Sequence, residues 1–405
     1  MLLLPLRERE KKMYVTRPLS MYRKSPSTLS MEPPDAPYSG YLVITDEEAE
    51  AEDSFCWGRC KRKNVKKLPF PQDKILTILH STEYGETTAT KVWFLPVLDK
   101  PLSSNRYYVI RAKGKYKGKA CKCSREEDVM ACCFSNMLME KKPKSFDLKD
   151  LYQQFKIHSH QSGGFFAKSI APDGIPPKPL RRKGWKVRSS SSLRRLGEAL
   201  GLDTSLRALL PDFNFPILRK RSASVVVGKW FCPFIFVREK AGLKHQMKKS
   251  TFYSMTLEQK WEEIYSCRNV DSEDNVVIVN VDVQREVTLV AGKEARKDDR
   301  NGDNGFIWFR VDNPNGRGGV LGVGLSSAIV ENIRWVEEAG GWVNGAEREV
   351  KVERVEQISG ETEWERFGCY VLVESFVLRR MDGSLVMKWD FRHTNRIQCK
   401  WECDL

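Results

Sequence analysis

The stretch Gly368–Phe391, with the sequence GCYVLVESFVLRRMDGSLVMKWDF, decides the fold of the C-terminal part of the chain. It contains two runs rich in Val, Leu, Phe and Tyr, and the segment Met381–Gly383 separates them. An Asp-Gly pair between two such runs is a strong signal for a tight turn that joins antiparallel strands. The stretch therefore predicts a β-hairpin with strands at 368–380 and 385–391.

Further strands are predicted on the N-terminal side of this hairpin, because runs rich in Val, Ile, Tyr and Phe recur between Pro or Gly residues. These runs are 40–45, 75–80, 91–98, 106–111, 225–227, 231–237, 276–283, 306–311 and 320–330. Helices are predicted at 129–139, 148–155 and 257–265, where a capping residue precedes apolar residues at helical spacing. Hairpins outnumber any strand–helix–strand pattern, so we predict an α+β, strand-dominated fold with mostly antiparallel strands.

The 405 residues are enough for two domains. Residues 161–222 are rich in Pro, Gly, Ser and basic side chains, a composition typical of a connecting segment. We therefore predict an N-terminal α+β domain at 13–160, a basic Pro/Ser-rich connector at 161–222 and a C-terminal strand-rich domain at 223–405. Residues 1–12 are predicted to be an appendage or a mis-assigned start, with Met1 and Met13 as the alternative starts of translation.

The charge of the chain is unevenly distributed. Residues 1–270 carry 50 Lys and Arg against 28 Asp and Glu, and residues 271–405 carry 18 against 25. Residues 141–221 alone carry 18 basic against 6 acidic side chains. Such a segment favours contact with an anionic partner, and its docking on the acidic C-terminal region is the alternative.

Two basic runs are the candidates for contact with an anionic partner. Cations can bind phosphate or carboxylate groups, and an aromatic ring beside them can stack on a nucleic-acid base. A partner protein and an anionic membrane surface both fit, whereas nucleic acid has less support because no nucleic-acid-binding motif accompanies the runs. The candidate residues are Lys61, Arg62, Lys63, Arg181, Arg182, Lys183, Trp185 and Lys186.

Closely spaced cysteines form a second candidate site. Cys56 and Cys60 are separated by three residues, and Cys121 and Cys123 by one. Thiolates at short spacing can bind zinc, so these four are candidate metal ligands, with free or structural thiols as the alternative. The sequence contains no complete catalytic or cofactor motif. We predict no cofactor other than this zinc alternative.

The location of the protein is predicted from its apolar runs and its cysteines. None of the apolar runs is long enough to span a bilayer, and the N-terminal one is too short for a signal peptide. The odd number of cysteines, 11, fits reduced thiols better than a full set of disulfides. We therefore expect a protein of the cytoplasm or nucleus that is not secreted.

Long segments distributed over nearly the whole chain from Met13 onward share a recognisable pattern. They are Met13–Ser20 (MYVTRPLS), Pro96–Ile110 (PVLDKPLSSNRYYVI), Phe165–Val187 (FFAKSIAPDGIPPKPLRRKGWKV), Gly197–Pro216 (GEALGLDTSLRALLPDFNFP), Val225–Val237 (VVVGKWFCPFIFV), Ser250–Cys267 (STFYSMTLEQKWEEIYSC) and Phe367–Glu402. Together they resemble the plant proteins of the family called domain of unknown function 1262. The resemblance implies an intracellular plant protein, and it supplies no reaction, cofactor or catalytic residue.

The leading functional hypothesis is a non-enzymatic interaction protein that acts in plant stress or defence responses. The lack of a recognisable catalytic set and the basic segment both favour this hypothesis. The first alternative is an enzyme whose site is assembled from residues distant in sequence. The second alternative is a thiol-based zinc or redox protein.

Overall fold

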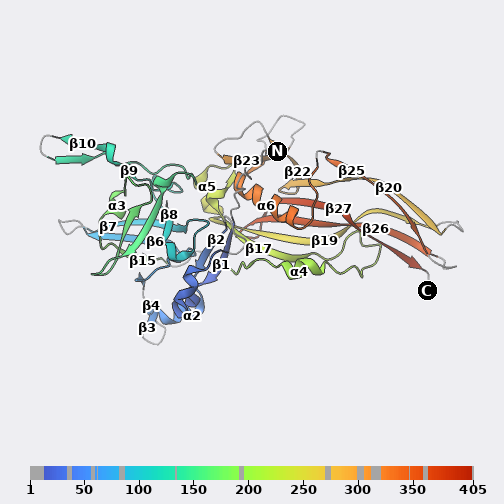
Figure 1. Ribbon diagram of the computed structural model, residues 1–405, viewed down its shortest axis with the longest axis horizontal. Helices are drawn as coiled ribbons and strands as arrows, with labels where there is room; N and C mark the ends of the chain where they lie inside the picture. The colour runs from blue at the N-terminus through green and yellow to red at the C-terminus, as the bar shows by residue number, and fades with distance from the viewer. Residues whose placement is uncertain are drawn as a thin grey trace, which may run out of the picture. The chain divides into compact units, whose positions relative to one another are not determined.

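The computed structural model describes residues 13–33, 39–55, 60–61, 63–81, 87–132, 135–190, 196–269, 275–298, 305–311, 321–345, 347–358 and 364–403. Contacts between residues divide the chain into two compact units. The N-terminal unit consists of Lys11–Leu200 with Gly242–Lys248, and the C-terminal unit contains Gly201–Ala241 and Lys249–Leu405. The fold is dominated by strands that are mostly antiparallel, as predicted (Figure 1).

A seven-stranded sheet in the order β13-β12-β8-β7-β6-β15-β5 forms the centre of the N-terminal unit. One face of this sheet buries aliphatic side chains and the aromatic rings of Phe70, Phe94, Phe165 and Trp185. The strands of the unit are β1 (Tyr14–Pro18), β2 (Gly40–Ile44), β3 (Ser54–Phe55), β4 (Cys60–Lys61), β5 (Asn64–Val65), β6 (Leu76–Ser81), β7 (Thr87–Pro96), β8 (Arg106–Arg111), β9 (Ser124–Arg125), β10 (Val129–Cys132), β11 (Ser135–Leu138), β12 (Gln154–Ser159), β13 (Phe165–Ser169), β14 (Gly174–Ile175) and β15 (Lys186–Ser189). Its α-helices are α1 (Leu19–Lys24), α2 (Glu47–Glu52) and α3 (Lys178–Arg181), and α5 (Leu243–Lys249) joins it from later in the chain.

Helix α5 is part of the N-terminal unit although it follows more than forty residues of the C-terminal unit. Its side chains pack over Gly118, where an added Cβ would lie 2.7 Å from atoms of both Leu243 and Met247. Gly118 also has a φ of +84°, a conformation that other residues rarely adopt. A glycine is therefore required at this point for the segment to pack closely.

The predicted connector at 161–222 is corrected by the structure. β13 pairs with β12, and β15 lies between β6 and β5, so residues 165–189 belong to the seven-stranded sheet. The division between the units falls between Leu200 and Gly201. A basic segment can form a sheet strand because its side chains alternate: Val187 is buried, whereas Lys186 and Arg188 are exposed.

Three long antiparallel strands, β19, β26 and β27, lie side by side in the C-terminal unit (Figure 1). The predicted hairpin is confirmed, and Gly383 in its turn has a φ of +85°. The strands of the unit are β16 (Gly201–Leu202), β17 (Val225–Pro233), β18 (Val237–Glu239), β19 (Phe252–Arg268), β20 (Val276–Gln284), β21 (Glu286–Val290), β22 (Lys293–Asp298), β23 (Phe306–Val311), β24 (Gly322–Ser326), β25 (Glu349–Gln357), β26 (Trp364–Arg380) and β27 (Leu385–Cys403). Its α-helices are α4 (Thr204–Leu209) and α6 (Ser327–Ala339).

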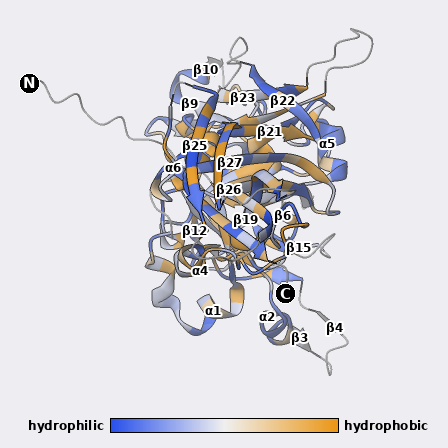
Figure 2. Cartoon of the chain, turned by 90° about the vertical axis from the view of Figure 1, so that its right-hand side faces the viewer, coloured by the Kyte–Doolittle hydropathy of each residue, from blue (hydrophilic) through white to orange (hydrophobic). Residues whose placement is uncertain are grey.

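The strands of the C-terminal unit follow the order β18-β24-β23-β22-β21-β27-β26-β19-β17, with β16 beside β17. β20 and β25 pair separately as a two-stranded ribbon, and both hydrophobic and hydrophilic residues occur along β25 (Figure 2). Val277 and Val279 of this ribbon pack on Phe367 and Cys369 of β26. Among the described residues, no helix combines the length and apolar character needed to cross a membrane.

The helices predicted at 129–139, 148–155 and 257–265 are wrong. The first segment forms the hairpin of β10 and β11, and the hydroxyl of Ser124 donates to the carbonyl of Met139 at 3.1 Å instead of capping a helix. The second forms a short 3₁₀ turn at Leu151–Gln153 and then β12. The third lies within β19, where Leu257, Gln259 and Trp261 are buried at the spacing of two that a strand requires.

Candidate functional sites

The two basic runs that were predicted to bind an anionic partner come together in the N-terminal unit. β15 pairs with the edge strand β5, with Val187 opposite Val65 and Arg188 opposite Asn64. The backbone N–H of Ser189 also donates to the carbonyl of Lys63 at 2.7 Å. Two runs far apart in the sequence therefore share one side of the sheet.

The register of the neighbouring strands extends these runs into a basic face. Thr77 of β6 lies opposite both Lys91 of β7 and Arg188 of β15, so these residues point to the same side of the sheet. Lys186 is two residues from Arg188 and shares this side, and Lys66 follows β5 at the edge. No acidic residue occurs in β5, β6, β7 or β15. We call Lys91, Lys186 and Arg188 the basic face.

Trp185 lies on the opposite side of the sheet from the basic face, which corrects its predicted role. Its side chain is 1% exposed, and its indole N–H donates to the carbonyl of Leu180 at 3.1 Å. A ring that is buried in the core cannot stack on a nucleic-acid base. Arg181 also has a structural contact, because its guanidinium lies 2.9 Å from the carboxylate of Glu140.

The other predicted anion-binding residues have different positions. Lys63 and Lys183 are exposed, and Arg182 is half-buried with a partner inside the protein. Arg62 lies outside the described residues, and only the backbone of Lys61 is described, in β4. The structure thus keeps part of the predicted cation set on the surface and adds Lys91 of β7 to it.

The candidate zinc ligands Cys121 and Cys123 are buried in the core of the N-terminal unit. Burial raises the pKa of the Cys121 thiol to about 12 and that of Cys123 to about 11. Both thiols are therefore protonated at neutral pH, whereas zinc binds thiolates. Cys56 lies outside the described residues, and only the backbone of Cys60 is described, in β4.

A cluster of buried charges in the C-terminal unit was not recognised in the sequence. The Nε of Arg207 in α4 donates to Oε1 of Glu374 in β26 at 2.8 Å, and a second guanidinium N–H donates to Oε2. The Nε2 of His393 in β27 lies 3.0 Å from Oε2 of Glu374 and 3.2 Å from Oε2 of Glu337 in α6. The side-chain amide of Gln259 in β19 donates to Oε1 of Glu374 at 2.7 Å. We call these five residues the buried ion cluster.

The protonation of the buried ion cluster follows from its contacts. Burial and the charge of Glu374 raise the pKa of Glu337 to about 8. Burial opposes a charge on His393, but hydrogen bonds to Glu337 and Glu374 outweigh it and raise the pKa of the imidazole. Burial also opposes the charge of Glu374, but Arg207 and His393 overcome it and lower its pKa. At neutral pH these shifts favour the uncharged form of Glu337 and the charged form of Glu374.

Glu337, Glu374 and His393 are also of the residue types that hold metal ions, and their ligand atoms lie within 4.8 Å of one another. However, Arg207 binds both oxygens of Glu374 and already supplies a positive charge there. The arrangement is thus that of a buried ion network joining α4, α6 and three strands, and it provides no open coordination position on Glu374.

The raised pKa of Glu337 leads to a prediction of how the stability of the protein depends on pH. The pKa of this group rises from an ordinary value of 4.5 to about 8 on folding, so the folded state binds more protons between these values. The stabilising contribution of the bound proton is complete below about pH 4.5 and declines as pH rises through about 8. We expect Glu337→Gln, which keeps the side chain neutral, to lose less stability than the wild type between about pH 5 and about pH 9.

Urea unfolding at these two pH values measures this difference. Glu331→Gln on the exposed side of the same helix is the matched control, and it should follow the wild type. Equal slopes of stability against pH for Glu337→Gln and the wild type would show that Glu337 does not carry the proton.

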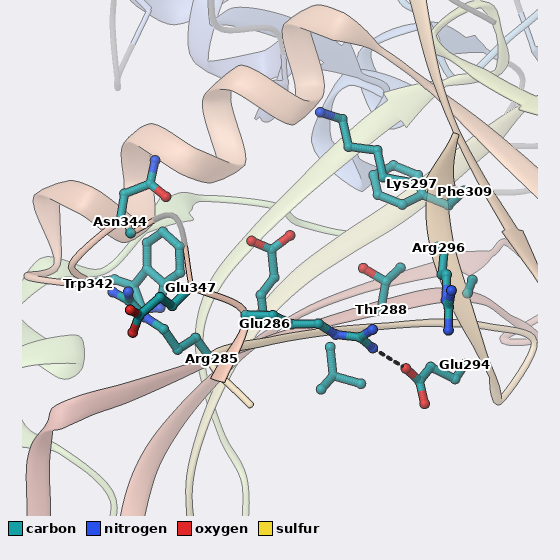
Figure 3. A pocket seen from close by; sticks show the side chains of 14 residues that line it. Arg285, Glu286, Thr288, Glu294, Arg296, Lys297, Phe309, Trp342, Asn344 and Glu347 are labelled. Carbon is teal, nitrogen blue, oxygen red and sulfur yellow. Dashed lines mark hydrogen bonds and ion pairs between the residues drawn. The ribbon is translucent and has the colours of Figure 1, made fainter. Parts of the chain in front are cut away.

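A polar cavity of about 280 Å³ lies beside β21 and β22 in the C-terminal unit (Figure 3). Two of its acidic groups have partners: Arg348 lies 2.7 Å from Glu294, the ion pair marked by the dashed line that ends on Glu294. Glu286 accepts a hydrogen bond from the indole N–H of Trp389 at 2.9 Å. Because acids and bases alternate around this cavity, it does not select one class of ligand.

The comparisons with known proteins agree with the resemblance found in the sequence. Residues 35–134 match the model of the family described as protein of unknown function (DUF1262). Among curated proteins, none matches the chain. The crystal structure of Cry35Ab1 is similar with 12% sequence identity and a TM-score of 0.46, and the match covers 82% of this chain and 90% of that chain. A likeness at this level does not assign a function.

Proposed function

We propose that the protein is a non-enzymatic interaction module whose basic face binds an acidic segment of a partner protein. The observation that carries this proposal is the strand register, which gathers Lys91, Lys186 and Arg188 on one side of a sheet. None of the four strands that form this face contributes an acidic side chain. Like-signed cations on adjacent strands repel each other, and an acidic partner would remove this repulsion.

An acidic protein segment fits this face better than nucleic acid or a membrane. Trp185 is buried in the core and so is not exposed for stacking on a base, and Trp57, the other ring close to the cations in the sequence, lies outside the described residues. A membrane-binding face commonly adds exposed apolar side chains, whereas the positions between the cations are Thr77, the half-buried Leu79 and Ala89. A face that offers cations, but neither an exposed aromatic ring for bases nor exposed apolar side chains for a bilayer, favours an acidic protein segment as its partner.

The location and biological role expected from the sequence belong to the same proposal. We propose an intracellular plant protein of the cytoplasm or nucleus that acts in stress or defence responses. The odd number of cysteines, 11, supports an intracellular location, because it fits reduced thiols better than a full set of disulfides. Zinc binding by Cys56, Cys60, Cys121 and Cys123 stays a separate proposal, which elemental analysis of the purified protein would test.

Charge reversal of the basic face is the direct test. We expect Lys186→Glu combined with Arg188→Glu to weaken binding of poly-L-glutamate at least about tenfold, because two attractions become repulsions. Raising NaCl from about 0.05 M to about 0.3 M should weaken binding of the wild type in the same titration. Fluorescence anisotropy of labelled poly-L-glutamate measures both effects.

The matched control is Lys144→Glu combined with Lys149→Glu, which reverses two exposed charges of the same unit that lie outside β5, β6, β7 and β15. Equal affinities of the two double variants would show that the basic face is not the binding surface. Tighter binding of phosphatidylserine vesicles or single-stranded RNA than of poly-L-glutamate would overturn the proposed class of partner.

A further inference from the structure

A cavity of about 350 Å³ in the N-terminal unit has an apolar floor. The buried side chains of Ile78, Val92, Val109 and Leu180 form this floor together with the thiol of Cys121. The high pKa of Cys121, about 12 because of burial, keeps this thiol uncharged. Thr90, which lies opposite Ile78 in the register, adds a buried hydroxyl to this mainly apolar floor. The cavity can therefore accept an apolar group over most of its floor.

Arg111, the last residue of β8, places a positive charge at the edge of this apolar cavity. It lies opposite Val92 in the register, which directs its side chain to the face of the sheet that carries the floor. Within the part of the chain that the structure describes, its buried Nε has no hydrogen-bond acceptor. A buried cationic donor without an acceptor costs about 1–3 kcal/mol or more, so this arrangement does not serve stability.

The other charged residues around the cavity have partners or lie at its rim. The ammonium of Lys122 is 2.7 Å from Asp150, and that of Lys141 is 2.6 Å from Asp128. Arg111 and the exposed Lys142 differ from them, because no ion pair joins either one to an acidic group among the described residues. The cavity thus has an excess of positive charge at one end.

Glu140 does not cancel this positive charge, because it holds the two walls of the cavity together. One of its oxygens lies 2.9 Å from the guanidinium of Arg181, and the other accepts the backbone N–H of Lys178 at 3.2 Å. These contacts tie the wall at Lys141–Pro143 to the wall that contains Pro177 and Leu180. The walls are therefore fixed before a ligand binds.

We propose that this cavity binds a small apolar carboxylic acid, with its carboxylate at Arg111 and its apolar part over the floor. A guanidinium presents N–H groups in a fork that matches the two oxygens of a carboxylate. The volume is at the lower end of the range of ligand cavities, about 300–1,000 Å³, which suits a short- or medium-chain acid. This binding site is distinct from the basic face and does not depend on it.

Isothermal titration calorimetry with octanoate and with octan-1-ol tests the inference on the full chain. The two probes share their apolar part and differ in charge, so the wild type should bind octanoate at least about tenfold more tightly. Arg111→Met should lose this preference, because Met keeps much of the side-chain volume without the charge. Arg106→Met, at the other end of the same strand, is the matched control and should bind as the wild type does.

Stability separates a binding role of Arg111 from a structural role. If Arg111 serves ligand binding, Arg111→Met should be at least as stable as the wild type to urea, because the unsatisfied donor is removed. A marked loss of stability in Arg111→Met would assign the residue to the fold and overturn the inference. Absence of octanoate binding, or equal binding of octanoate and octan-1-ol, would also overturn it.

Discussion

Replacement of Arg207 by Met is expected to lower the free energy of unfolding by about 3–5 kcal/mol, the usual cost of leaving a buried charge without its partner. Both oxygens of Glu374 receive N–H groups from Arg207, and the exposed fraction of the Glu374 side chain is 1%. A third guanidinium contact, to the carbonyl of Val336 at 2.8 Å, joins α4 to α6. The substitution therefore removes a charge and a link between two helices at once. Equilibrium unfolding in urea measures the loss.

A double variant gives this prediction its control. Arg207→Met combined with Glu374→Met removes both charges, so much of the lost stability should return. Lys351→Met breaks an exposed ion pair with Glu353, and it should change stability by less than about 1 kcal/mol. A double variant as unstable as Arg207→Met alone would show that packing of Arg207, and not its charge, stabilises the unit.

Replacement of Trp185 by Ala is expected to lower the free energy of unfolding by about 3–5 kcal/mol, as for other large buried side chains. The Trp185 ring stacks on Phe94 with centroids 6.1 Å apart and packs against Phe165 at 5.4 Å. The substitution leaves a cavity among these rings and also removes the hydrogen bond to Leu180. Thermal and urea unfolding of the purified variant measure the effect.

Lys186→Ala is the control next to this position, because its side chain points to the other side of the sheet. We expect Lys186→Ala to change the free energy of unfolding by no more than about 0.5 kcal/mol, which is typical of a substitution at an exposed position. The loss of unfolding free energy in Trp185→Phe should lie between those of Trp185→Ala and Lys186→Ala, because phenylalanine retains an aromatic ring but lacks the indole N–H. If Trp185→Ala were as stable as Lys186→Ala, the ring would not belong to the core.

Local sequence predicted the strands well where alternation and turn chemistry agree. The hairpin of β26 and β27 was recognised from two apolar runs and Asp382-Gly383, and Gly383 has the positive φ that such a turn needs. Mostly antiparallel pairing followed from the same signals. These features depend on residues close together in the chain, so a sequence contains them directly.

Helices and strands were predicted wrongly where the same apolar residues fit both the helical spacing of three to four and the strand spacing of two. In β19, Leu257 and Trp261 are four apart, which fits a helix, but they also fall on the same face of a strand. Helix α6 was missed for the opposite reason, since the run 320–330 was interpreted as a strand. Ile329, Ile333 and Val336 are buried at spacings of four and three, the pattern that would have identified this helix.

The candidate sites were only partly predictable, because strand register determines which distant residues meet. The basic runs near Lys63 and Lys186 are visible in the sequence, but only the pairing of β5 with β15 brings them together. Arg111 resembles any other basic residue until its buried Nε is seen without an acceptor. Similarly, Glu337 and His393 lie in α6 and β27, and no local pattern connects them.

The position of α5 has a consequence for the order of events during synthesis on the ribosome. The N-terminal unit needs Gly242–Lys248, and Leu243 and Met247 of this segment pack over Gly118. Residues 11–200 therefore lack one of their packing partners until the start of the C-terminal unit has been translated. Completion of the first unit must wait for part of the second, which couples the two during biosynthesis.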